Sequence, residues 1–172
     1  MFSDSRRIPA EGDWQMRVNL RPMKKKDMAL IRKLTVETGW NSLSKMDQKE
    51  LDKKEWSKHM EEVFEHFAKQ ENSEIYIAED ENNKFLGYLF VGESKNNMTG
   101  NSSGFIYDIF VKEELRGKGI GKKLIEKAES YCRQRGYSRL SLMVSAHNQP
   151  ALKLYASTGF KKDQIYMDKE IG

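Results

Sequence analysis

The chain has 172 residues, of which 38% are hydrophobic and 33% charged, a composition typical of one soluble globular domain with a sizeable core. No stretch approaches the roughly 18 consecutive apolar residues of a membrane-spanning helix, so a membrane protein is not expected. Thirty Lys and Arg side chains are interleaved with 26 Asp and Glu, and the mild net charge of +4 argues against nucleic acid as a partner.

Residues 1–15 are expected to form a flexible arm, and 16–172 to form a single domain. The arm lacks the apolar run of a secretory signal, and the single cysteine, Cys132, excludes an internal disulfide, so we expect a cytoplasmic protein. Cys132 is expected to be a buried thiol. His59 and His66 lie on one helix without a third ligand, so no metal site is expected.

The first half of the domain is expected to hold one strand and two helices. Alternating apolar and charged side chains predict a strand over 16–22 that ends at Pro22. Asp27 is a suitable cap for a helix that stops near Gly39. A second helix is expected over 45–69. Its apolar stripe consists of Trp56, Met60, Val63, Phe64 and Phe67.

Three strands are expected to follow. The segment 74–79 reads EIYIAE, an Asn-Asn pair at 82–83 predicts a turn, and 85–91 would be the hairpin partner. The polar segment 94–103 is expected to be a loop. The run 105–111 (FIYDIFV) is almost continuously apolar, which is typical of a strand buried on both faces.

The last third of the chain alternates helices and strands. Apolar periodicity predicts a helix over 119–135 and a strand over 137–145. A short helix over 148–158 and a final strand over 164–171 complete the order. The segment 105–145 forms one strand-helix-strand crossover, so its two strands should be parallel. The fold class is therefore α/β or α+β, in one domain.

A glycine-rich segment joins the strand at 105–111 to the next helix. Gly117, Gly119 and Gly121 let the backbone turn and present its N–H groups, which with the helix dipole form a site for an anion, most naturally a phosphate. The basic side chains around it are Arg116, Lys118, Lys122 and Lys123. A connection that merely turns the chain is the alternative. The spacing fits neither a P-loop nor a dinucleotide fingerprint, and the strand at 137–145 lacks the acidic residue that NAD requires.

The same segment resembles a known family. Arg116-Gly-Lys-Gly-Ile-Gly121 is similar to the pyrophosphate loop, R/Q-x-x-G-x-G/A, of the GNAT superfamily of N-acetyltransferases. The likeness covers roughly a third of the chain, from about Gly104 to Phe160. Its other elements are Ile109-Phe-Val111, Leu142, Val144, Asn148, Ala151, Tyr155 and Gly159. It implies a GNAT-like domain, in which a mostly antiparallel central sheet is splayed between two parallel strands and flanked by helices.

The resemblance implies acetyl-CoA as the acyl donor, bound without a metal. The pyrophosphate would lie on the glycine loop, and the pantetheine arm would lie between the splayed strands, paired with the backbone of the first. The Val111 N–H would face the thioester oxygen and stabilise an oxyanion. Asn148 would contact the pantetheine, in addition to or instead of capping a helix. The implied acetyl-CoA-binding residues are Ile109, Phe110, Val111, Arg116, Gly117, Lys118, Gly119, Ile120, Gly121, Lys122 and Asn148.

Tyr155 matches the general acid of the family, which protonates the departing CoA thiolate. Independently, the spacing of Asn148 and Tyr155, at i and i+7, places them on one face of a helix. The alternative is a core tyrosine that packs on Phe160. Because a phenol suits proton transfer to a thiolate, we favour the catalytic role.

The general base is missing from its usual place. Many relatives carry Glu on the strand equivalent to 140–144, where this chain has Met143, a side chain that cannot accept a proton. Asp108 is the candidate replacement, because an unpaired carboxylate in a central strand is costly and commonly functional. A structural pairing of Asp108 with an arginine, or a cap at a bulge, is the alternative. Tyr107 and Glu79 are weaker candidates for ordering the acceptor or a water.

We therefore expect an N-acetyltransferase that moves acetyl from acetyl-CoA to a primary amine by direct attack in a ternary complex. The acceptor would be a small amine or polyamine, or a peptide or protein amine, and the helices after the first strand would form the wall of its site. The alternative, for which Met143 is the main argument, is a non-catalytic acyl-CoA sensor or interaction module. A homodimer paired through the C-terminal strand is a further expectation.

Overall fold

The computed structural model describes residues 17–96, 99–169 and 171. The strands are β1 (Asn19–Pro22), β2 (Glu74–Glu79), β3 (Phe85–Lys95), β4 (Ser102–Val111) and β5 (Leu140–Leu142). The helices are α1 (Met28–Ser42), α2 (Lys45–Glu50), α3 (Lys53–Ala68), α4 (Ile120–Gln134) and α5 (Gln149–Ser157), with 3-10 turns at Lys25–Asp27 and Glu113–Leu115. The arm predicted over 1–15 lies outside the described residues.

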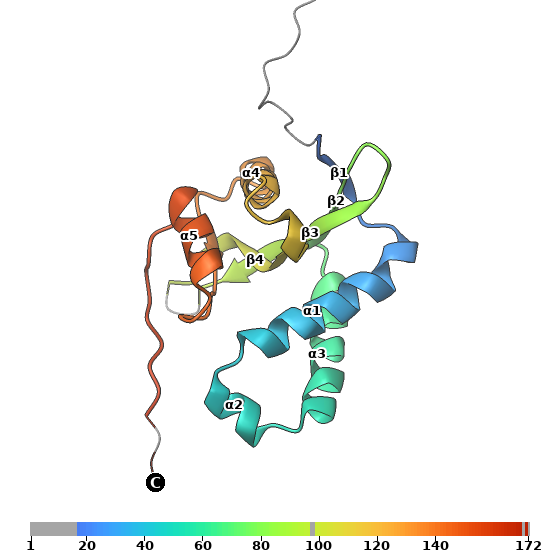
Figure 1. The fold of residues 1–172 in the computed structure, drawn as a ribbon. Helices are drawn as coiled ribbons and strands as arrows, with labels where there is room; N and C mark the ends of the chain where they lie inside the picture. The colour runs from blue at the N-terminus through green and yellow to red at the C-terminus, as the bar shows by residue number, and fades with distance from the viewer. Residues whose placement is uncertain (1–16, 97–98, 170, 172) are drawn as a thin grey trace, which may run out of the picture.

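The strands form a five-stranded sheet in the order β1-β2-β3-β4-β5. All neighbours are antiparallel except β4 and β5, which are parallel. Helix α4 lies on one side of the sheet, and α1 and α3 lie on the other (Figure 1). The predicted mixed, mostly antiparallel fold is thereby confirmed. Within the described ranges, no helix has both the length and the apolar character needed to cross a membrane.

The helices predicted in the first half differ from the structure. α1 continues past Gly39 instead of ending there. This glycine allows close packing between helices, because a Cβ there would lie 3.1 Å from the Trp56 ring. The single helix predicted over 45–69 is two helices, α2 and α3. Asp52 separates them, since its Oδ1 accepts two backbone N–H groups of α3 at 2.9 Å each and so caps that helix.

Other strand predictions also differ. β3 and β4 extend into the loop predicted over 94–103, and β5 is shorter than the strand predicted over 137–145. The strand predicted over 164–171 is absent from the described part of that segment, which runs along the outside of the molecule (Figure 1). The apolar side chains of 165–167 are exposed there, and a β-type pattern forms a strand only where a sheet edge pairs with it. A dimer contact through this segment stays a prediction.

The sheet separates two hydrophobic cores. On the side of α1 and α3, Phe64 packs edge-to-face on Phe90 of β3, with ring centroids 5.6 Å apart. On the side of α4, Leu124 and Ala128 are fully buried. β4 contributes side chains to both cores, as its apolar run predicts. Cys132 is a buried thiol, also as predicted, and burial raises its pKa.

An irregularity in β4 decides which of its side chains face α1. Residues 90–91 of β3 pair with Asp108 and Ile106, which are not neighbours in the chain. Tyr107, between them, is the extra residue of a β-bulge. A bulge shifts the alternation of the residues that follow it. Tyr107 and Asp108 therefore both lie on the α1–α3 side of the sheet.

β4 and β5 separate soon after they pair. Their parallel ladder joins 104–106 to 140–142, as expected for strands connected by the α4 crossover. Beyond Ile106, β4 continues to Val111 with no partner on its β5 side among the described residues. This stretch, 107–111, is called the open edge of β4 below.

Candidate active site

Asp108 lies in a cluster of hydroxyl groups. Tyr88 of β3 donates a hydrogen bond to Asp108 Oδ2, and Thr38 Oγ1 of α1 lies 3.0 Å from the same oxygen. Thr35 Oγ1 lies 2.9 Å from Tyr88 Oη. In the described part of the chain, no arginine or lysine pairs with Asp108, so the structural ion pair weighed as an alternative is not found there.

The surroundings of Asp108 make it a stronger base. Burial raises the pKa of its carboxyl above the ordinary 3.8, and the hydrogen bonds from Tyr88 and Thr38 offset part of this rise. Burial and the charge of Asp108 also raise the pKa of Tyr88 well above its ordinary value, so Tyr88 stays a hydrogen-bond donor. Asp108 is thus an oriented, half-buried carboxylate whose raised pKa makes it a better proton acceptor than an ordinary aspartate.

Tyr155 lies on α5, on the face predicted from its spacing with Asn148. Asn148 caps this helix, since its Oδ1 accepts the Ala151 N–H at 3.2 Å. The Tyr155 side chain is 8% exposed and packs edge-to-face on Phe160, with ring centroids 5.6 Å apart. The helix cap and the core contact that were weighed as alternatives are therefore both present, and neither occupies the Tyr155 hydroxyl.

The hydroxyl of Tyr155 has the properties of a proton donor. Burial, with a further contribution from the negative charge of Asp108, raises the pKa of Tyr155 to about 12, so the phenol is protonated at neutral pH. No described residue forms a hydrogen bond with this hydroxyl. Asp108 therefore influences the protonation of Tyr155, although one residue lies on β4 and the other on α5.

The glycine loop has the backbone geometry of an anion site. Gly117 and Gly119 adopt left-handed conformations, with φ of 78° and 80°, and Gly119 is the N-cap of α4. The N–H groups of the first turn of α4 therefore point out of the helix toward the loop. Gly121 allows Leu154 of α5 to pack closely, since a Cβ there would lie 2.8 Å from Leu154 Cδ2.

The side chains of the loop divide into two kinds. Arg116, Lys118 and Lys122 are exposed, where their charges can meet a phosphate. Ile120 is 1% exposed and belongs to the core beneath α4, so only its backbone is available to a ligand. The loop therefore combines fixed N–H donors with mobile positive charges, an arrangement suited to a pyrophosphate.

The last residue of the open edge of β4, Val111, lies beside this loop. The Lys112 N–H donates to Leu86 O on the β3 side, at 3.0 Å. Because backbone groups alternate along a strand, Val111 and Ile109 direct theirs to the opposite side, where β5 does not follow. There the Val111 carbonyl accepts a hydrogen bond from Arg116 Nε, at 3.4 Å, which connects the open edge to the glycine loop.

Phe110 differs from its two neighbours. Its carbonyl faces β3, where a Cβ on Gly87 would collide with it. Its ring stacks on Tyr88, with centroids 5.8 Å apart. Of the predicted segment 109–111, then, the backbone of Ile109 and Val111 faces the open edge, and Phe110 packs in the core.

Other predicted side chains are exposed or engaged elsewhere. Met143 follows β5 and is 86% exposed. Glu79 is buried at the other end of the sheet and pairs with Arg21, at 2.6 Å. Tyr107 Oη donates to the Glu93 carbonyl at 2.7 Å. Across the ranges that the structure describes, no three His, Cys, Asp or Glu side chains gather at a metal site.

Sequence reasoning missed three members of the Asp108 cluster: Thr35, Thr38 and Tyr88. The two threonines stand at i and i+3, a spacing that places both hydroxyls on one face of α1 and could have marked that face. Tyr88 carries no such signal, because a tyrosine within an apolar strand is typical of a core.

Residues 40–160 match the model of the acetyltransferase (GNAT) family. This segment covers more than half of the chain and contains the glycine loop, the open edge of β4 and α5. The chain belongs to the GNAT family. The family predicted from the sequence is thereby confirmed, and the GNAT segment runs from the end of α1 to just past α5.

Individual relatives agree with the GNAT assignment. The uncharacterized N-acetyltransferase YycN of Bacillus subtilis is 43% identical over 67 residues, which are 39% of this chain and 43% of that protein. A Pyrococcus furiosus structure named as an acetyl transferase has a TM-score of 0.74 and 27% identity, over 90% of this chain and 100% of that chain. A Clostridium acetobutylicum protein predicted to be an acetyltransferase, solved with acetyl-CoA, shares the fold at a TM-score of 0.66 and 19% identity, over 90% and 96% of the two chains. The chain spans about half the length of the curated relatives it matches.

Proposed function

We propose that this GNAT protein transfers the acetyl group of acetyl-CoA to a primary amine, by direct attack of the amine in a ternary complex. The main support is a pair of titratable groups: Asp108 on the open edge of β4, a carboxylate of raised pKa that Tyr88 and Thr38 orient, and Tyr155 on α5, a phenol with a pKa of about 12. Transfer from a thioester to an amine requires one group that accepts a proton and one that gives a proton, and this pair supplies both.

The glycine loop and the open edge of β4 fit acetyl-CoA. The α4 N-terminus and the exposed basic side chains of the loop suit its pyrophosphate. Backbone groups of Ile109 and Val111, together with the Asn148 side chain, suit the amide-bearing pantetheine arm. The Val111 N–H, directed to this edge, would stabilise the oxyanion that forms at the thioester carbonyl. The fold shared with the Clostridium structure solved with acetyl-CoA supports this choice of donor.

The proton transfers balance between two residues. An alkylamine has a pKa near 10, so it must lose a proton to become nucleophilic. The nitrogen loses this first proton to solvent and a second proton as it attacks the carbonyl. Asp108 accepts the second proton, directly or through a water, while Tyr88 and Thr38 hold the carboxylate in place. Tyr155 gives its proton to the sulfur, which leaves as the CoA thiol. Exchange with solvent returns both groups to their starting states.

Release of free thiol from acetyl-CoA tests the proposal. The assay uses separate pools of polyamines, aminoglycosides, arylalkylamines, and peptides with free N-termini or lysines. We expect release above background with at least one pool. Acetyl-CoA that binds without release from any pool would favour the alternative of a non-catalytic acyl-CoA sensor, the reading supported by the exposed Met143.

The contribution of the glycine loop is tested by Gly119→Ala. A left-handed conformation costs a residue with a Cβ about 1 kcal/mol, and at this position a Cβ would meet no atom within 4 Å. We therefore expect a loss of about 1 kcal/mol in urea unfolding, together with weaker acetyl-CoA binding by calorimetry, because the N-cap geometry of α4 changes.

Gly100→Ala is the matched control for Gly119→Ala. Gly100 has a φ of 73° and equally open surroundings, but it lies outside the loop. It should lose stability and retain acetyl-CoA affinity. An unchanged affinity in Gly119→Ala would remove this residue from the acetyl-CoA site.

A further inference from the structure

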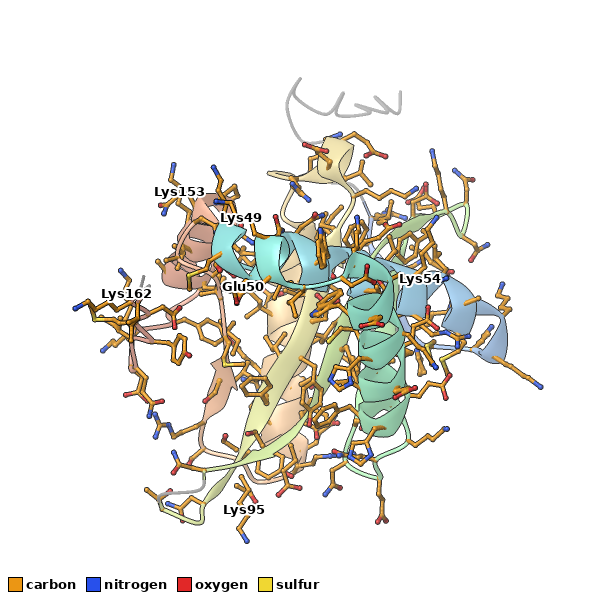
Figure 2. The ribbon with its side chains drawn as sticks, turned by 90° about the horizontal axis from the view of Figure 1, so that it is seen from below. Lys49, Glu50, Lys54, Lys95, Lys153 and Lys162 are labelled. Carbon is orange, nitrogen blue, oxygen red and sulfur yellow. The ribbon has the colours of Figure 1, made fainter. Side chains whose placement is uncertain are left out.

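A groove lies between α3 and the β3–β4 hairpin, on the same side of the sheet as Asp108. Its volume is about 460 Å³. Apolar and aromatic side chains line most of it, among them Met60, Val63, Phe67, Phe105, Tyr107 and Met143. Figure 2 shows α3 alongside the hairpin, with Lys54 near the start of the helix and Lys95 at the end of β3.

The lining is unusually apolar for an open surface. Phe67, Phe105 and Tyr107 are only partly buried, although aromatic side chains gain much from full burial. Met143, which also lines the groove, is 86% exposed. Concave apolar surfaces with a few polar groups at one end are typical of ligand sites in globular proteins.

The groove reaches one member of the hydroxyl cluster around Asp108, Thr35. Thr35 lines the groove, and its Oγ1 lies 2.9 Å from Tyr88 Oη, which donates to Asp108. Tyr107, the bulge residue next to Asp108, lines it as well. An amine whose nitrogen reaches Asp108 would therefore extend the rest of its molecule along the groove.

The charges of the groove do not suit a polycation. Glu93 is the acidic residue of the described lining, and its carboxylate already accepts a hydrogen bond from Asn72 Nδ2 at 2.7 Å. Lys95 lies at the same end and would repel an ammonium group. A second or third ammonium would thus lose hydration while it meets one carboxylate, already hydrogen-bonded, beside the like charge of Lys95.

We infer that this groove selects a primary amine carried by an elongated apolar or aromatic group, in preference to polycationic amines. The apolar part would be buried against the aromatic rings and methionines, which gains free energy in proportion to the apolar area removed from water. The single nitrogen would lie at Asp108. This inference rests on the proposed acetyl transfer.

The first test compares kcat/KM for 4-phenylbutylamine with the values for spermidine and kanamycin, at saturating acetyl-CoA. We expect kcat/KM for 4-phenylbutylamine to be higher by about tenfold or more, the effect of burying two methylene groups. Equal or higher values for the two polycations overturn the inference. Thiol release with those amines would at the same time uphold acetyl transfer.

The second test fills the groove with Val63→Trp. We expect its KM for 4-phenylbutylamine to rise about tenfold. Its KM for methylamine should stay the same, because methylamine has no apolar group long enough to occupy the groove. Val36→Trp, the same change in a separate groove between α1 and α3, is the matched control and should alter neither value. Met143→Ser removes apolar lining at an exposed position that does not support the core, and it should raise the same KM.

The outcomes distinguish a failure of the inference about the groove from a failure of the proposed acetyl transfer. If neither Val63→Trp nor Met143→Ser raises the KM for 4-phenylbutylamine, the groove does not select the amine and the inference is overturned. If no amine releases thiol, acetyl transfer fails, and calorimetry of 4-phenylbutylamine with the CoA-bound protein decides about the groove. If 4-phenylbutylamine binds and Val63→Trp weakens this binding, the inference about the groove is supported. If 4-phenylbutylamine does not bind, the inference is overturned.

Discussion

Tyr155→Phe is expected to lower kcat for acetyl transfer by about 100-fold while the affinity for acetyl-CoA stays the same. The substitution removes only the hydroxyl, which is protonated at neutral pH because burial and the charge of Asp108 raise its pKa to about 12. The hydroxyl forms no hydrogen bond with another described residue, so its removal breaks no contact of the fold. The packing of the ring on Phe160 is retained. What is lost is the proton for the departing thiolate.

The measurement pairs thiol release at saturating amine with calorimetry of acetyl-CoA binding. Tyr137→Phe is the matched control, because Tyr137 also has a pKa raised to about 12 but packs near Tyr131, at the far end of α4 from the glycine loop. It should keep the kcat of the unmodified protein. A Tyr155→Phe variant with unchanged kcat would exclude Tyr155 as the general acid.

Asp108→Asn is expected to lower kcat/KM by about 100-fold, the usual contribution of a general base. In the unmodified protein, activity should fall toward acid pH as Asp108 takes up its proton. The midpoint of that fall should lie above 3.8, because burial raises the pKa of this carboxyl. The acid limb should be absent from the residual activity of the variant. A pH profile identical in the two proteins would assign the base to another group.

The same substitution should not destabilise the fold. Because its pKa is raised, Asp108 binds a proton more tightly in the folded chain than in the unfolded chain. The resulting stability is present below pH 3.8 and is lost as the pH rises through the raised pKa. At pH 7 the charge of this half-buried carboxylate is therefore a net cost, and asparagine, whose Oδ1 still accepts hydrogen bonds from Tyr88 and Thr38, removes it.

Urea unfolding at pH 7 separates lost chemistry from lost structure in Asp108→Asn. The free energy of unfolding should equal or exceed that of the unmodified protein. A large decrease would mean that the carboxylate is structural. Asp163→Asn, at a position with 75% side-chain exposure, is the matched control and should leave both stability and kcat/KM unchanged.

Several features could be predicted because they depend on neighbours in the chain. Gly117 and Gly119 adopt left-handed conformations that other residues avoid, so the turn into α4 is visible in the composition of the segment. The face shared by Asn148 and Tyr155 follows from helical spacing alone. The parallel pairing of β4 and β5 follows from the crossover between them.

Other features depend on contacts between distant segments. The strand predicted over 164–171 finds no edge to pair with among the described residues. The bulge at Tyr107, which turns Asp108 toward α1, arises from the register between β3 and β4. A pattern along one segment contains no information about that register.

The sequence by itself determined the family and the position of the glycine loop, and it nominated Asp108 and Tyr155 as the candidate titratable residues. Only the tertiary structure decided that Thr38 and Tyr88 orient Asp108 and that its charge raises the pKa of Tyr155. The physical reason is that helical spacing and glycine conformation are local properties of the chain. The pKa of a carboxyl, by contrast, depends on how much solvent folding removes from it and on which hydrogen-bond donors folding brings to it.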